Sequence, residues 1–191
     1  MTPNPLKGHP TAGAHCHVPS RTATPLAAAH LKRHRQTYTV ATLVPFDPGY
    51  TALVGTAVYV FAYYEWAVIY LIQQFKPGFV SRYCRGTPMT SGQVKRELEG
   101  ILNDASTVYT EVSRAELDAY CNRFASLIDK RNALIHAHPI TDTDGSQILN
   151  YQAKIDRPLP DMKWPIPSVE QVLQEFDSAA CDANALLHRL R

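Results

Sequence analysis

The sequence predicts a mostly α-helical protein: an up-and-down bundle of four to five helices with a small β-hairpin before the last helix. Four long segments have apolar residues at three- and four-residue steps, the spacing of one face of an α-helix. Proline and glycine, which interrupt helices, follow several of these segments. A turn sequence between the third and last segments separates two short stretches with strand character.

Length and composition favour one compact domain with some unstructured chain. The 191 residues are 45% hydrophobic and 19% charged, which is enough apolar material for a core. Lys and Arg total 19 against 17 Asp and Glu, so the formal net charge is only +2. A nucleic-acid partner would therefore have to be attracted by a local basic patch.

The first 45 residues are rich in Pro, Thr, Ala and His and have no periodicity, which predicts a disordered arm over 1–45 and a helical domain over 46–191. The arm lacks the apolar stretch of a secretory signal. Its basic cluster Lys32–Arg35 is typical of a solvated linker and is only secondarily a phosphate-contacting arm. The triplet His15–His17 has residues too close together to close a structural metal site.

The cysteines indicate a reducing compartment. They are scattered without a C-x-x-C pair, which disfavours a zinc cage of the usual spacing. We therefore expect a cytosolic protein with reduced thiols, and no cofactor. The four positions are Cys16, Cys84, Cys121 and Cys181.

The first helix is predicted over Pro48–Phe75, because Lys76-Pro77-Gly78 follows and ends it. One carboxylate, Glu65, interrupts its apolar face and needs a cation or donors nearby, which makes it a candidate partner of a buried Arg. The other residues of that face are Val54, Val58, Phe61, Val68 and Ile72.

The same segment is a candidate membrane span, because Glu65 is the only charged residue in the 22 positions from Thr51 to Ile72. An acid near the centre of a span costs about 2.5–3.5 kcal/mol on insertion scales. Tyr59, Tyr63, Tyr64 and Tyr70 also lie within the segment and not in belts at its ends. These features favour a helix of a soluble bundle and no membrane association.

Three further helices are predicted. A loop with Gly86, Pro88 and Gly92 as breakers precedes a second helix that begins at about Ser91. Ser113 and Glu116 form a capping-box pattern that starts the third helix, which continues to Ala137 and is stopped by Pro139. Ser168 is predicted to cap the last helix.

A hairpin is predicted before that last helix. Its arms are His138–Thr141 and Gln147–Ile155, on either side of the turn residues Thr141–Gly145. The Pro-rich stretch Pro158–Pro167 is predicted to be a linker across the surface.

Polar residues gather at the end of the third helix. At about 100° per residue, Arg131 lies on the inner apolar stripe, whereas Asn132 and His136 are neighbours on an adjoining face. His138, seven residues after Arg131, returns to nearly the same side. Polar side chains therefore surround one helix end that is otherwise apolar.

The pattern Arg131-Asn132-x-x-x-His136 resembles the R-x4-6-H motif of HEPN domains (higher eukaryotes and prokaryotes nucleotide-binding). The motif itself spans about six to eight residues, whereas the resemblance in helical architecture extends over residues 49–191. It implies a four- or five-helix bundle that dimerises and places two motifs across a shared cleft. Many HEPN domains are metal-independent ribonucleases of toxin–antitoxin and antiviral defence systems, whereas others only bind.

The resemblance implies a role for each residue. His136 would be the general acid/base, since histidine exchanges protons near neutral pH. Arg131 would stabilise the charge of the transition state, and Asn132 would orient the phosphate or the histidine. A second His136 from the dimer partner would divide the acid and base roles. Glu65 is placed beside Arg131 by analogy with acidic residues on the first helix of some HEPN domains.

His138 departs from the family pattern, because the toxin branch associated with minimal nucleotidyltransferases has a Tyr two residues after the motif histidine. It is an additional candidate acid/base or phosphate ligand.

The leading hypothesis is a homodimeric endoribonuclease that cleaves single-stranded RNA, with an antitoxin or operon partner. The alternative is a non-catalytic module that binds a nucleotide, RNA or protein. An ordinary helix-end network, with histidines stabilised by the helix dipole, explains the same residues without any site.

Overall fold

The computed structural model describes residues 47–86, 88–153 and 159–191, so the predictions about the N-terminal arm and residues 154–155 of the hairpin lie outside the described residues. In this part the chain forms helices and one small antiparallel sheet, which confirms the predicted fold class. The helices are α2 (Pro48–Phe75), α3 (Phe79–Arg85), α4 (Ser91–Asn103), α5 (Arg114–Ile135) and α6 (Ile166–Arg189).

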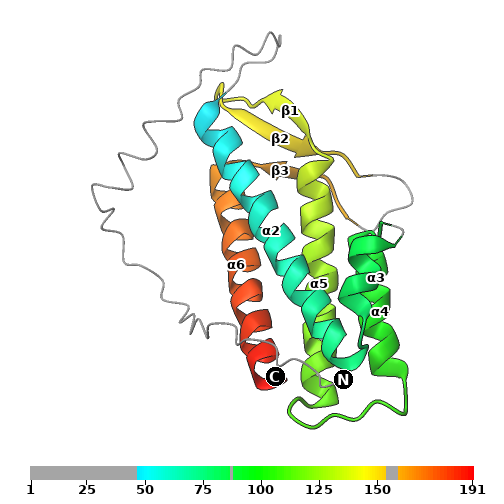
Figure 1. Ribbon diagram of the computed structural model, residues 1–191. Helices are drawn as coiled ribbons and strands as arrows, with labels where there is room; N and C mark the ends of the chain where they lie inside the picture. The colour runs from blue at the N-terminus through cyan, green and yellow to red at the C-terminus, as the bar shows by residue number, and fades with distance from the viewer. Residues whose placement is uncertain (1–46, 87, 154–158) are drawn as a thin grey trace, which may run out of the picture. The chain divides into compact units, whose positions relative to one another are not determined.

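The sheet lies at one end of the bundle (Figure 1). Helices α2 and α6 both start at this end and run side by side away from it, whereas α5 runs toward it. The short helices α3 and α4 lie together beside α2 and α5. The end of α5, which carries the predicted motif, is therefore brought to the sheet.

Aromatic rings from three helices form the centre of the core. Phe61 of α2 lies with its ring centroid 5.0 Å from that of Phe176 of α6. Tyr64, one turn later in α2, meets Phe124 of α5 edge to face at 5.5 Å. All four side chains are almost fully buried. The inner face of α2 thus contacts both long partner helices.

The strands follow the order β1 (His138–Thr141), β2 (Gln147–Tyr151) and β3 (Met162–Trp164). The predicted first arm of the hairpin is confirmed, and the second arm ends at Tyr151. The turn contains Gly145 at φ +84°, a left-handed conformation that favours glycine.

Tyr50, in the first turn of α2, connects this helix to the sheet through two hydrogen bonds. Its hydroxyl donates to the carbonyl oxygen of Trp164 at 2.6 Å and accepts from the backbone N–H of Leu149 at 2.9 Å. One side chain therefore satisfies backbone groups of both β2 and β3.

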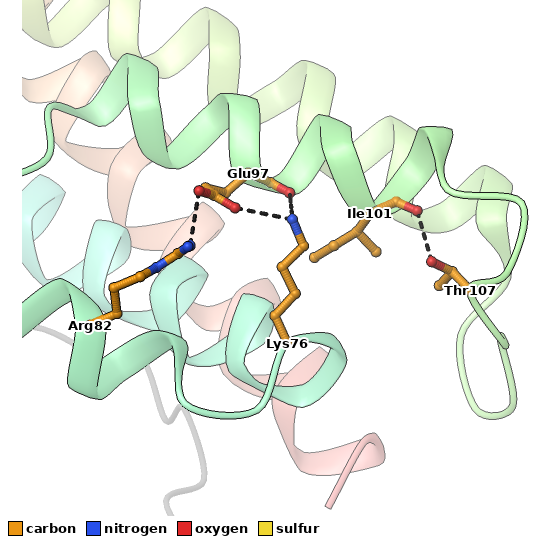
Figure 2. A network of polar contacts seen from close by, with 5 residues as sticks. All are labelled: Lys76, Arg82, Glu97, Ile101 and Thr107. Carbon is orange, nitrogen blue, oxygen red and sulfur yellow. Dashed lines mark hydrogen bonds and ion pairs between the residues drawn. The ribbon is translucent and has the colours of Figure 1, made fainter.

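A charged cluster joins α2, α3 and α4 on the far side of the bundle from these strands. Figure 2 shows the Glu97 carboxylate between Lys76, at 3.0 Å, and Arg82, at 2.9 Å. Nearby, the end of α4 is closed by the Thr107 hydroxyl, which donates to the carbonyl oxygen of Ile101 at 3.1 Å.

Two elements were not predicted. Helix α3 lies where a loop was expected; it follows Gly78, at φ +86°, and buries Phe79 in the core. It is too short to give a periodic signal. Strand β3 lies in the segment predicted to be a linker, where Trp164 pairs with Leu149 and buries its ring. Strand β3 forms only by pairing with β2, and the local sequence of residues 162–164 does not encode that pairing.

The helix ends differ in detail from the predictions. The last helix starts at Ile166 and not after Ser168, because Pro167 in its first turn needs no hydrogen-bond donor. Ser113 does cap α5, but the Glu116 side chain pairs with Arg189 instead of closing a capping box. The complete capping box belongs to Thr90 and Gln93 at the start of α4.

Candidate functional site at the end of helix α5

Arg131 points into the bundle. Its guanidinium donates to the hydroxyl of Ser91, at the start of α4, and lies 4.9 Å from the centroid of the Phe61 ring of α2. The predicted position on the inner stripe is therefore correct. These contacts place a cation among helices α2, α4 and α5, where the aromatic face and the hydroxyl partly replace water.

Glu65 lies one turn after Phe61 on α2, yet no ion pair joins it to Arg131 in the described part of the chain. Its Oε1 atom is buried without a hydrogen-bond partner among the described residues. Burial raises the pKa of Tyr83 on α3, and the nearby charge of Glu65 raises it further. The carboxylate thus lies toward α3, while the Arg131 guanidinium is occupied by Ser91 and the Phe61 ring.

Helix α5 ends at Ile135, two residues before the predicted end at Ala137, and His136 is its C-cap. Its backbone N–H donates to the carbonyl oxygen of Asn132 at 3.0 Å, and its side chain is exposed. Asn132 is half-buried. Along the helix, His136 is five residues from Arg131, a rotation of about 140°. The two ends of the motif therefore lie on different sides of α5.

His138 begins β1 and is exposed on the outer face of the sheet. The strand register pairs it with Asn150, and Asn150 with Lys163, so these three residues form a row across the outer face. Lys163 is held by Asp142 at 2.8 Å, and its hydrogen bond keeps the pKa of that carboxyl below its usual value.

Ala137 separates the two histidines and packs against the core. Since His136 and His138 flank it and are both exposed, both imidazoles lie on the solvent side of this junction. Sequence analysis identified both histidines but missed Asn150 and Lys163. The signal for Asn150 was available in the hairpin register, whereas that for Lys163 required the unpredicted strand β3.

The described residues contain no group of three or more His, Cys, Asp or Glu side chains that could hold a metal ion. A hollow of about 520 Å³ lies between α2 and α3 and is lined in part by Tyr70, Cys84 and Arg85. None of the predicted site residues lines it.

Comparison with known proteins adds no relative: no protein family, no curated protein and no solved structure matches the chain. The resemblance to HEPN domains thus rests on the short motif and remains a prediction.

Proposed function

We propose that this protein is a metal-independent endoribonuclease in which His136 and His138 of one protomer share the acid and base roles. The observation that carries the proposal is the pair of exposed imidazoles flanking Ala137, beside the polar row on the sheet. It replaces the expectation that a second His136 across a dimer cleft supplies the missing group.

The chemistry requires two proton transfers. One imidazole takes the proton of a ribose 2′-hydroxyl as its oxygen attacks the adjacent phosphorus, and the other protonates the departing 5′-oxygen. The products are a 2′,3′-cyclic phosphate and a 5′-hydroxyl. Asn150 and Lys163 carry the N–H donors for the phosphate oxygens, although Asp142 offsets part of the charge of Lys163.

Arg131 has a different role in this proposal. Its guanidinium holds α5 against α2 and α4 through Phe61 and Ser91, so it positions the helix end without contacting substrate. Asn132 supports His136 through the backbone turn. The expected partners are single-stranded RNA and a second copy of the chain. An antitoxin or operon partner and a cytosolic location stay predictions.

The test is cleavage of a fluorescent single-stranded RNA in the presence of EDTA. His136→Ala and His138→Ala should each lower the cleavage rate by about 10²–10⁴-fold, the usual contribution of a general acid or base. His188→Ala, at an exposed histidine near the end of α6, is the matched control and should keep the wild-type rate. The 5′ fragment should carry the 2′,3′-cyclic phosphate at its 3′ end, and the 3′ fragment should begin with a 5′-hydroxyl. Wild-type protein that cuts no RNA contradicts the proposal.

One observation favours the non-catalytic alternative: the Arg131 guanidinium is engaged inside the bundle and is not presented to a ligand. A binding module predicts that wild-type protein retains RNA without cutting it. In that case Lys163→Ala should weaken retention and reduce its salt dependence, because a phosphate contact releases counterions. Filter binding at two salt concentrations measures both effects.

A further inference from the structure

Helix α2 carries an aromatic stripe on the surface of the bundle. Tyr59 is 76% exposed and Tyr63 52%, while Trp66 and Tyr70 are 39% and 41% exposed. On the same face lie two small exposed residues, Ala52 and Thr56. We call these six residues the outer stripe. At about 100° per residue they fall within a narrow arc of the helix, on the side opposite Phe61. At one edge of this arc the Tyr63 hydroxyl accepts from the Asn184 amide of α6 at 2.9 Å.

The outer stripe has the character of a contact surface. It contains no charged residue over 19 positions, and the Thr56 hydroxyl already donates to the carbonyl oxygen of Ala52 at 2.8 Å. With 150–250 Å² per aromatic side chain, the exposed parts of its four rings sum to roughly 300–500 Å². That is as large as the largest apolar patch of a typical monomer and about half of what one partner contributes to a stable interface.

The order of side-chain sizes along the stripe makes it complementary to itself. When two copies of α2 are laid antiparallel about a two-fold axis at residue 61, Ala52 faces Tyr70 and Thr56 faces Trp66 of the other copy. Tyr59 then faces Tyr63 across the axis. Each small residue of one helix meets a large ring of the other. Because a two-fold axis makes every contact occur twice, the same pairs form at both ends of the helix pair. An uncharged face also brings no like charges together.

We infer that the outer stripe is the interface of an antiparallel homodimer, with a second copy of this chain as its occupant. The hollow beside Tyr70 supports this register. Because Ala52 faces Tyr70, the hollow lies opposite the beginning of the partner's α2 and leaves room for it.

This dimer separates the two candidate sites. The start of α2 lies next to the sheet, where Tyr50 binds Leu149 and Trp164. Pro48 lies 13 residues from the axis, or about 20 Å at 1.5 Å per residue, so the two sheet ends lie roughly 40 Å apart. The His136 residues consequently do not share a cleft. The inference concerns the interface alone and holds whether or not the protein cleaves RNA.

The first experiment measures the molar mass of the full chain in solution by light scattering. Wild-type protein should have twice the chain mass of 21.3 kDa. Ala62→Glu, an exposed alanine flanking the stripe, should have the mass of one chain because it buries two like charges near the axis. Ala119→Glu is the matched control, an exposed alanine on α5, and should remain dimeric. Far-ultraviolet circular dichroism is the folding control, and both variants should keep the helical spectrum of the wild type.

The second experiment tests the antiparallel register with a short thiol-specific cross-linker. The background protein carries Cys16→Ser and Cys84→Ser. Ala62→Cys lies one residue from the axis and should cross-link to its own copy. Ala52→Cys lies 18 residues from its copy, or about 27 Å, and should not cross-link. Efficient Ala52→Cys cross-linking indicates a parallel pair and overturns the register.

Three results overturn the interface itself. One is a wild-type protein that stays monomeric at high concentration. Another is an Ala62→Glu variant that stays as dimeric as Ala119→Glu. The third concerns a bilayer, since α2 is long and apolar enough to cross a membrane. If the wild-type protein floats with phosphatidylcholine vesicles, lipid and not a second copy of the chain covers the outer stripe.

Discussion

The guanidinium of Arg131 lies over the ring of Phe61, 4.9 Å from its centroid. The first residue of the motif is thereby tied to the centre of the core, since the same ring contacts Phe176 and Phe124. The motif residue expected to touch substrate instead joins α5 to α2, and through Ser91 to α4. Substitution of Arg131 should therefore be read first in the stability of the fold, and only through the fold in any activity.

Replacing Arg131 with alanine should lower the free energy of unfolding by about 1–3 kcal/mol, because it removes a partly desolvated cation–π contact and a charged hydrogen bond. Urea denaturation measures the change. Arg114→Ala, at an exposed arginine of the same helix, should change stability by no more than about 0.5 kcal/mol. Equal effects of the two substitutions would show that the Phe61 contact contributes nothing.

Removing the hydroxyl of Tyr50 should be costly despite the small change in volume. Tyr50→Phe leaves the N–H of Leu149 and the carbonyl oxygen of Trp164 without a partner in a buried place, at about 1–3 kcal/mol. Hydrogen exchange of the Leu149 amide should accelerate at the same time. Tyr83→Phe is the control, because the Tyr83 hydroxyl makes no hydrogen bond within the described residues, and it should change the free energy of unfolding by no more than about 0.5 kcal/mol.

Glu97→Gln should have a small effect that depends on salt. It removes the carboxylate charge from Lys76 and Arg82, but both cationic side chains are partly exposed, so the loss should stay below about 1 kcal/mol. Because exposed charges are screened, the wild type and the variant should converge in stability above about 1 M salt. A difference that persists there indicates a steric cause.

Alkaline pH should destabilise the protein through its buried tyrosines. Burial raises the pKa of Tyr64 from 10.0 to about 12, and burial beside Tyr64 raises that of Tyr120 as well. Below pH 10 both phenols are neutral in the folded and unfolded chain, and their contribution is complete. Between pH 10 and 12 the unfolded chain loses these protons and the folded chain keeps them, so unfolding becomes easier by about 1.4 kcal/mol per pH unit and tyrosine.

Denaturation curves between pH 8 and 11.5 measure this slope, and Tyr64→Phe should flatten it. An identical slope in the variant assigns the alkaline transition to other groups.

The sequence predicted those elements whose signal is local. The apolar periodicity and the breaker at Pro77 gave α2 its observed bounds, Pro48–Phe75. Ser113 marked the start of α5, and the hairpin was found from its turn. Strand β3 and helix α3 were missed, since one depends on pairing with β2 and the other is a single short segment held by the burial of Phe79.

The candidate site was predicted in its position along the chain but not in its geometry. Helical angles correctly separated Arg131 from Asn132 and His136. They could not show that Ser91, 40 residues earlier, receives the guanidinium. They also could not place Lys163 in one row with His138 and Asn150, because that row depends on two strand registers at once.

The side-by-side course of α2 and α6 also has a consequence for synthesis of the chain. About 90 residues separate the end of α2 from the start of α6. At 5–20 residues per second, translating them takes roughly 5–20 s. During that time the ribosome carries an apolar helix whose main partner has not yet been made. A nascent chain of this kind is a ready client for chaperones, and silent codon changes that slow translation of 76–165 should lower its soluble yield.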